Sequence, residues 1–155
     1  MAAKKKAAKK PVRRKAARAK ARPKRKKPET LRLREGVAGF TVNDIARSIA
    51  WYRDTLGWTV GEEWRDQGRL IGAEMVAGKI SLYLGQDDWK KGRDRKKGEG
   101  LRLYFRTAQS VDELAALIKG RGGVLDHDPK DEPWGERDFG ITDPDGFKIT
   151  ISNTH

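Results

Sequence analysis

Three short segments of this 155-residue chain alternate apolar side chains with cationic or aromatic ones. They read KISLYL at 79–84, LRLYFRT at 101–107 and FKITIS at 147–152. This alternation predicts strands with one buried face. The other face then carries Ser81, Tyr83, Arg102, Tyr104, Arg106, Lys148 and Thr150. Phenol rings beside cations suit an anionic or planar aromatic ligand, although the same groups can also be solvated on an open sheet.

A group able to transfer protons is harder to identify. Glu74, in the strand-like segment LIGAEMVA at 70–77, is a weak candidate if it points to the ligand side. We expect the acidic cluster around His127, which comprises Asp126, Asp128, Asp131 and Glu132, to form a solvated turn. His127 is then a surface residue in a loop. The chain has no cysteine, which excludes thiolate catalysis and disulfides.

The order of the expected elements repeats. The first half predicts strands in 31–42, 58–64, 70–77 and 79–84, with a helix over 44–57 capped by Asn43 or Asp44. The second half predicts strands at 101–107, 123–128, 137–142 and 147–152, with a helix over 110–122. A long polar loop, 85–100, joins the halves. The pattern is βαβββ twice, an α+β fold.

Apolar spacing defines the buried side of each helix. The expected buried stripe of the first helix is Ile45, Ile49, Tyr52 and Leu56, followed by a glycine stop at Gly57. Ser110 and Glu113 form a capping-box pattern at the start of the second helix. The expected stripe of the second helix is Val111, Leu114, Leu117 and Ile118.

Two longer stretches carry a family resemblance. VNDIARSIAWYRDTLGW resembles the first helix region, and PWGERDFGITDPDGFKITI the closing hairpin, of the glyoxalase, bleomycin-resistance and extradiol-dioxygenase superfamily, also called vicinal oxygen chelate proteins. The resemblance covers about residues 32–152. It implies a curled mixed sheet with helices on the convex face and a ligand cup on the concave face. Trp134 is then expected at the rim of the cup, and the protein is expected to be a homodimer.

Metal-dependent relatives place His or Glu at four positions facing the cup. By the resemblance, those positions hold Val37, Ser81, Arg102 and Thr150 here. Valine has no donor atom and arginine is a fixed cation, so this set does not suit a divalent ion. We therefore expect no metal and no other cofactor.

The charge of the chain is concentrated at its start. Residues 1–30 hold 15 of the 35 Lys and Arg residues and one of the 22 acidic residues, so the remaining 125 residues are close to neutral. The composition predicts a disordered tail, 1–30, before a domain at 31–155. Its Ala, Lys, Arg and Pro blocks resemble linker-histone tails. Candidate contacts to nucleic acid are Lys4, Lys5, Lys6, Lys9, Lys10, Arg13, Arg14, Lys15, Lys24, Arg25, Lys26 and Lys27.

Three functions remain open from the sequence. The first is a metal-independent small-molecule-binding protein of the bleomycin-resistance type. The second is a metal-independent lyase or isomerase. The third is a nucleoid- or RNA-associated protein in which the tail is the functional part. No apolar run is long enough to cross a membrane, and we expect a cytoplasmic protein, with association with the nucleoid as the alternative location.

Deletion of residues 1–30 tests the contribution of the tail. If the tail neutralises between six and ten phosphates, the affinity of the full chain for DNA falls by about 10³ to 10⁵ between 50 mM and 200 mM salt. The chain that lacks residues 1–30 is expected to lose DNA binding, as measured by fluorescence anisotropy. A shortened chain that binds DNA with the same salt dependence contradicts the prediction.

Overall fold

The computed structural model describes residues 35–153. The predictions made for the tail, and for residues 31–34 of the expected first strand, lie outside the described residues. The described elements follow the βαβββ order twice, as predicted. None of the described helices has the length and hydropathy needed to cross a membrane.

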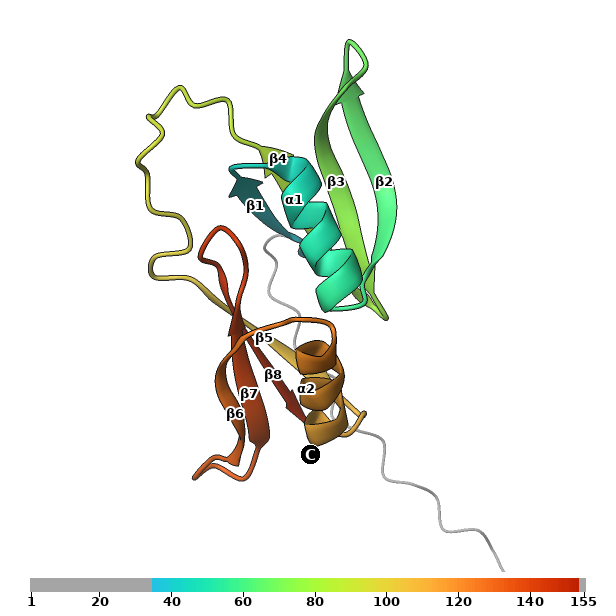
Figure 1. Cartoon of the computed structure of the whole chain (residues 1–155), viewed down its shortest axis with the longest axis vertical. Helices are drawn as coiled ribbons and strands as arrows, with labels where there is room; N and C mark the ends of the chain where they lie inside the picture. The colour runs from blue at the N-terminus through green and yellow to red at the C-terminus, as the bar shows by residue number, and fades with distance from the viewer. Residues whose placement is uncertain (1–34, 154–155) are drawn as a thin grey trace, which may run out of the picture. The chain divides into compact units, whose positions relative to one another are not determined.

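The first module builds one mixed sheet of four strands. Its elements are β1 (Ala38–Val42), α1 (Ile45–Ala50), a π-helical turn η1 (Trp51–Thr55), β2 (Thr59–Asp66), β3 (Arg69–Ala77) and β4 (Ile80–Gln86). The strand order is β1-β4-β3-β2, with β1 parallel to β4 and the other pairs antiparallel (Figure 1). The helix packs on β3 and β4, which leaves the opposite face of the sheet without a helix.

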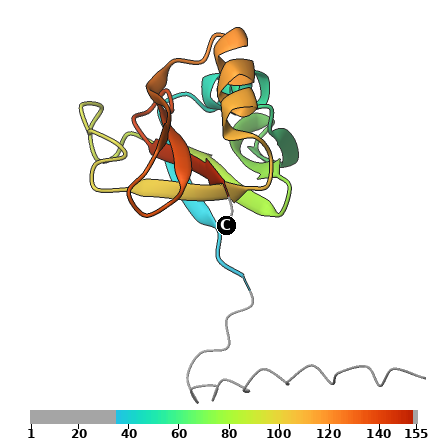
Figure 2. The ribbon, with the colours of Figure 1, turned by 90° about the horizontal axis from the view of Figure 1, so that it is seen from below.

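The second module repeats this arrangement. Its elements are β5 (Arg102–Thr107), α2 (Val111–Gly120), β6 (Leu125–Asp131), β7 (Arg137–Thr142) and β8 (Lys148–Asn153). The strand order is β5-β8-β7-β6, and β5 is parallel to β8. The α+β class is therefore confirmed, with the expected mixed sheet built as two four-stranded sheets. Figure 2 shows both helices on the same side of the strands.

The helices begin and end where the sequence predicts. Asp44 caps α1 by accepting a hydrogen bond from the backbone N–H of Arg47, and Ser110 caps α2 in the same way from Glu113. Gly57 ends the first helical segment with φ +76°, a left-handed conformation that glycine adopts without steric cost. The expected single helix over 44–57 instead widens into a π-helical turn at Trp51.

Three positions expected in the core are substantially exposed. Leu117 is 48 % exposed because the buried stripe of α2 runs through Val111, Ala115 and Ile118 instead. Ile80 and Leu101, at or just before the first residue of their strands, are each 42 % exposed. The remaining members of the two predicted helix stripes are buried or packed against the core.

The sixth strand corrects the expected solvated turn. Strand β6 extends to Asp131, so Asp126, His127, Asp128 and Asp131 lie on a strand and not in a loop. Pairing with β7 provides backbone partners for this polar stretch, although the pairing is irregular on both sides of His127. Only Glu132 of the predicted cluster lies beyond the strand. The predicted strand at 123–128 is therefore confirmed from Leu125 on, and the solvated turn predicted for the same acidic residues is wrong.

The two modules share one hydrophobic core. The rings of Phe40 on β1 and Phe147, just before β8, stack with centroids 3.8 Å apart. Trp58, which follows η1, lies 5.5 Å from the ring of Phe105 on β5. These contacts bury aromatic surface from both halves of the chain and hold the modules against each other.

A polar contact inside this core joins α1–η1 to the turn between β7 and β8. The carboxylate of Asp143 accepts hydrogen bonds from the backbone N–H groups of Asp145 and Phe147, at 2.9 and 2.8 Å, and from the hydroxyl of Tyr52 at 3.1 Å. The adjacent Asp145 accepts from the backbone N–H of Asn43 and from the hydroxyl of Ser48. Burial raises the pKa of Asp143 and raises that of Tyr52 still further.

Replacing Tyr52 with phenylalanine removes one of the three donors to Asp143. We expect a loss of about 1–3 kcal/mol in the free energy of unfolding, because the carboxylate stays buried with an unmet hydrogen bond. The hydrogen bond from Tyr52 favours the ionised form of Asp143, and this form is populated only above the raised pKa of the carboxyl group. The loss should therefore be largest at neutral pH and shrink as the pH falls through the raised pKa.

Urea denaturation at several pH values measures this difference. Tyr104→Phe is the matched control, since Tyr104 is 68 % exposed and its loss of a hydroxyl should leave stability within about 0.5 kcal/mol. A Tyr52→Phe loss that is independent of pH, or no larger than that of the control, contradicts the role assigned to the hydrogen bond.

Candidate ligand site on the open sheet faces

The face of the second sheet opposite α2 carries most of the predicted ligand-binding side chains. Parallel pairing of β5 with β8 aligns Arg102 with Lys148 and Tyr104 with Thr150. The guanidinium of Arg102 donates a hydrogen bond from Nη1 to Oγ1 of Thr150 at 2.9 Å. Thr150 is only 3 % exposed and lies on β8, between β5 and β7. The structure thus brings Arg102, Lys148 and Thr150 together.

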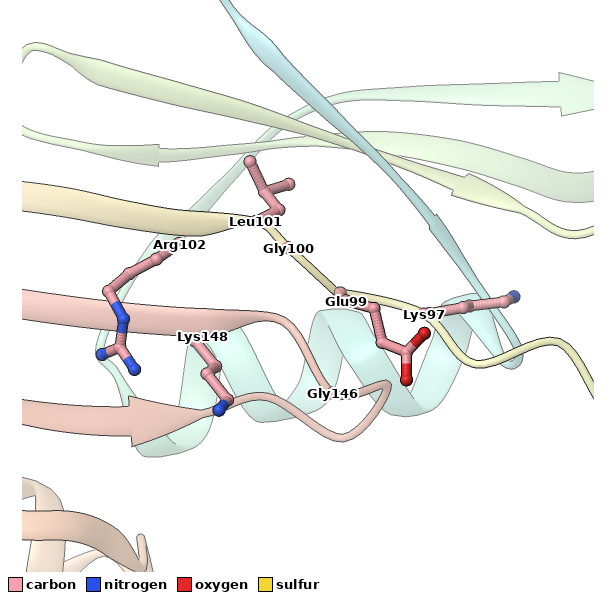
Figure 3. A pocket seen from close by; sticks show the side chains of 8 residues that line it. Lys97, Glu99, Gly100, Leu101, Arg102, Gly146 and Lys148 are labelled. Carbon is pink, nitrogen blue, oxygen red and sulfur yellow. The ribbon is translucent and has the colours of Figure 1, made fainter.

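A hollow of about 370 Å³ opens beside these residues (Figure 3). Its lining comprises Lys97, Gly98, Glu99, Gly100, Leu101, Arg102, Gly146 and Lys148. The side chains of Arg102 and Lys148 extend to the same side (Figure 3). Within residues 35–153, neither cation has an acidic side chain within ion-pair distance, whereas Glu99 lies near Lys96 at 3.7 Å. Arg102 and Lys148 are therefore unpaired within the described chain, although Glu99 also lines the hollow.

The connection between β4 and β5 forms one wall of this hollow. Its buried anchor is Asp87, whose carboxylate lies 2.7 Å from the ammonium of Lys97 and 2.6 Å from the guanidinium of Arg95. The ammonium of Lys97, at this distance, is the main cause of the strongly lowered pKa of Asp87. The ammonium of Lys97 also lies 5.2 Å from the centre of the Trp89 ring. These contacts hold a segment that the sequence predicts only as a long loop.

The end of the connection packs directly on the turn before β8. Gly98 has φ +71°, and a Cβ at this position would lie 2.2 Å from the carbonyl oxygen of Gly146. Gly146 has φ +97°, so both residues need glycine for their backbone conformation. This close approach places the segment 97–100 beside Lys148 and closes one side of the hollow.

Two other predicted residues form a separate cluster at the β6–β7 hairpin. Arg106 donates from Nε and Nη2 to one carboxylate oxygen of Glu136, at 3.0 and 2.8 Å. The indole N–H of Trp134 lies 3.3 Å from the other oxygen of Glu136. Trp134 is 64 % exposed and lines neither the hollow beside Arg102 nor the one beside Tyr83. The charge of Arg106 is thus matched by Glu136 and is less available to an anion than that of Arg102.

Tyr83 lies in a different hollow, on the open face of the first sheet. This hollow of about 320 Å³ is lined by Gly39, Phe40, Thr41, Trp64, Ile71, Gly72, Tyr83, Leu84 and Gly85. The rings of Tyr83 and Trp64 meet edge to face with centroids 5.1 Å apart. Gly72 is required there, because a Cβ would lie 2.7 Å from the Trp64 ring. Trp64 was not among the predicted ligand-binding residues, although it lies in the predicted strand segment 58–64.

The remaining candidate residues, Tyr104 and Glu74, lie outside the lining of both hollows. Tyr104 is on the same face as Arg102 but lines neither hollow. Glu74 pairs with Tyr83 in the β3–β4 register and so lies on the open face of the first sheet, with its carboxylate close to Gly61. The described chain therefore presents a cationic hollow on one sheet and an aromatic hollow on the other, instead of one lining that contains all the predicted residues.

The four positions that the resemblance assigns to metal ligands hold side chains that do not suit a divalent ion. Val37 has no donor, and Arg102 directs its guanidinium at Thr150, the position expected for a glutamate. Within residues 35–153, no group of three or more His, Asp or Glu side chains is arranged to hold a metal ion. The donor set at these positions does not fit a divalent ion.

Comparison with known proteins agrees with the fold and the repeated modules. Residues 36–151 match the sequence profile of the Glyoxalase/Bleomycin resistance protein/Dioxygenase superfamily. Proteins named bleomycin resistance protein, from Geobacillus stearothermophilus and Staphylococcus aureus, are each 28 % identical over 127 residues, which covers 76 % of this chain and 94 % of theirs.

Solved structures are also similar. A superfamily member from Sphaerobacter thermophilus is 25 % identical with a TM-score of 0.61, covering 76 % of this chain and 94 % of that one. A glyoxalase-related enzyme from Clostridium phytofermentans, 18 % identical, has a TM-score of 0.64 and covers 83 % of this chain and all of that one, which shows the fold alone. With its profile match spanning both modules, the chain belongs to the Glyoxalase/Bleomycin resistance protein/Dioxygenase superfamily.

Proposed function

We propose that this protein binds a small organic anion, preferably one with an aromatic ring, without a metal ion. The observation that carries the proposal is the pair of cations in one hollow, Arg102 and Lys148, with no acidic partner in the described chain. Superfamily membership supports a small-molecule ligand. The relatives named for bleomycin resistance support sequestration without turnover as the role.

The geometry of Arg102 favours a carboxylate or phosphate over a neutral ligand. One guanidinium nitrogen is already held by Thr150, which fixes the orientation of the group at little further entropic cost. The remaining N–H groups can donate to two oxygens of one anion. Lys148, on the neighbouring strand, adds a second charge. Such charge-assisted bonds are stronger than neutral ones, and the glycine-rich wall lets a ligand approach closely.

We further propose that the complete site forms in a homodimer. The cationic and aromatic hollows are each open to solvent, whereas small-molecule sites usually bury most of the surface of their ligand. In the proposed dimer, the Trp64–Tyr83 hollow of one subunit faces the Arg102–Lys148 hollow of its partner. An aromatic carboxylate would then have its ring against one sheet and its charge against the other.

The basic tail is proposed to contact polyanions independently of this site. Its support is the concentration of 15 Lys and Arg residues in residues 1–30. This role does not conflict with ligand binding, because the rest of the chain is close to neutral and has its own candidate site.

Arg102→Gln tests the anion site with benzoate as the probe. Losing one charge-assisted contact of about 1.5–3 kcal/mol should weaken binding about tenfold to a hundredfold, as measured by isothermal titration calorimetry on the full chain. Arg69→Gln is the matched control, since Arg69 is an exposed arginine at the end of the β2–β3 hairpin. Bleomycin is included in the comparison because the curated relatives carry its name.

The control is expected to bind benzoate as the unaltered chain does. Equal weakening by both substitutions would mean that the effect is a general loss of positive charge. Absence of benzoate binding by the unaltered chain, together with binding of bleomycin, would replace the proposed ligand class with that of the named relatives.

The dimer is tested by sedimentation equilibrium. We expect a dimer, and we expect benzoate to shift the equilibrium further toward it, since a ligand held between subunits stabilises their association. Trp64→Ala should weaken benzoate binding although Trp64 is on the sheet that lacks Arg102. A monomer whose benzoate affinity is unaffected by Trp64→Ala would falsify the shared site.

A further inference from the structure

Asp138 is a buried acid on the open face of the second sheet. It lies on β7 between Arg137 and the core residue Phe139, so its side chain points away from the hydrophobic core. The residue is 5 % exposed, and within the described chain its Oδ1 has no hydrogen-bond partner. Burying a carboxylate oxygen without a partner is costly, so this position requires an explanation.

The group that faces this oxygen is the imidazole of His127. Its Nε2 lies 3.8 Å from Oδ1 of Asp138, and its Nδ1 lies 3.1 Å from the carbonyl oxygen of Asp128. A carbonyl oxygen only accepts hydrogen bonds, so Nδ1 carries a hydrogen. A neutral ring would then direct the lone pair of Nε2 at a carboxylate. A proton between Nε2 and Oδ1 would give this carboxylate oxygen the partner that it lacks.

The burial of Asp138 also favours a proton on the pair. It raises the pKa of Asp138, and the nearby charge of Glu132 raises it further, while His127 lowers it. With this proton, whether it lies on the imidazole or on the carboxyl, the pair has no net charge. Without it, the pair has a charge of −1. The pair is therefore a place where one proton can be taken up or released on the sheet face.

The imidazole lies over Gly140, on the strand next to β8, and is not part of the lining of the cationic hollow. A Cβ on Gly140 would be 3.0 Å from both Nε2 and Cδ2 of His127, so the ring occupies the space above Gly140. Gly140 pairs with Thr150 across β7 and β8, and Thr150 holds the guanidinium of Arg102. Adjacent strands are about 4.8 Å apart, so the imidazole and the guanidinium lie over neighbouring strands.

Other charged groups surround the pair and must be considered with it. Those packed near it on the hairpin and the adjoining strands are Asp126, Asp128, Lys130, Glu132, Glu136 and, through its ion pair with Glu136, Arg106. Lys130 is itself paired with Glu132 at 2.8 Å, and Asp128 with Lys119 of α2. Asp126 accepts the hydroxyl of Thr142. Most of these charges are thus already matched, whereas Oδ1 of Asp138 is not.

We propose that His127, held by Asp138, is the second contact of an anion subsite shared with Arg102 across Gly140, and that a single proton on this pair controls anion affinity. The ligand class is a carboxylate or phosphate anion whose charged group spans neighbouring strands. The inference rests on the proposed anion binding at Arg102 and adds to it a residue, a proton and a direction of pH dependence.

The direction follows from linkage. An anion placed beside His127 favours the protonated form of the pair, so binding takes up a proton, or retains one that would otherwise be released. Affinity should therefore rise as the pH falls through the titration of the pair. If benzoate raises the midpoint of that titration by one pH unit, its dissociation constant is about tenfold lower on the acidic side than on the basic side.

The chain offers a clean measurement, because it contains only two histidines. His155→Gln leaves the imidazole signals of the full-length chain to His127 alone. NMR titration of these signals from about pH 5 to about pH 9, with and without benzoate, gives the midpoint for His127 directly. Calorimetry at both ends of this range gives the affinity for benzoate, which remains ionised throughout.

Three variants separate the pair from the rest of the site. In the His155→Gln background, Asp138→Asn should lower the midpoint, because the imidazolium loses its anionic partner. Gly140→Ala should displace the ring and change the midpoint, whereas Gly36→Ala is the control, since a Cβ there meets nothing within 4 Å. His127→Gln should retain the contact with Arg102 but remove the pH dependence of benzoate affinity.

Each outcome decides between the proposals. If benzoate binds but leaves the His127 midpoint unchanged, or if its affinity keeps the same pH dependence in His127→Gln, the shared subsite is wrong while the anion site at Arg102 stands. If the His127 midpoint in Asp138→Asn equals that of the parent, the two side chains do not share a proton. If benzoate does not bind at either end of the pH range, the anion site and this inference fail together.

Discussion

The carboxylate of Asp143 accepts three hydrogen bonds, two from its own turn and one from Tyr52 on the first module. It thereby fixes the conformation of the DPDG turn and its position against α1 and η1. The neighbouring Asp145 adds two contacts to the start of the same helical segment. Since β8 begins immediately after this turn, these contacts set the place at which Lys148 and Thr150 enter the sheet.

The candidate site depends on that placement in two ways. The parallel register of β5 and β8 aligns Arg102 with Lys148, and the antiparallel register of β7 and β8 aligns Gly140 with Thr150. The connection from the first module reaches the same turn, where Gly98 packs on Gly146. The buried ion pair of Asp87 and Lys97 secures this connection. A turn that joins the modules therefore also builds one side of the hollow.

Local patterns in the sequence were sufficient to predict the helices and most strands, and to predict which face three residues of the candidate site occupy. Alternation in the segments 101–107 and 147–152 assigned Arg102, Lys148 and Thr150 to one face, and pairing of β5 with β8 brings them together. Helix caps and glycine stops located both helices. These features are predictable because each depends on side chains within a few residues of one another.

Features that depend on pairing between distant segments were not predictable. The predicted strand at 123–128 continues to Asp131 through an irregular pairing with β7, which local alternation does not indicate. Tyr83 has the expected strand orientation but belongs to a separate sheet, which only the strand order reveals. The burial of Lys97 requires Asp87 and the ring of Trp89 to meet it across a loop without periodicity.

A crystal structure of the full chain with benzoate tests the central claim most directly. The account predicts the carboxylate of benzoate within hydrogen-bonding distance of the Arg102 guanidinium, close to Lys148, with Thr150 still accepting from Arg102. A well-ordered benzoate bound elsewhere on the described surface, with the hollow beside Arg102 filled only by water, would contradict it.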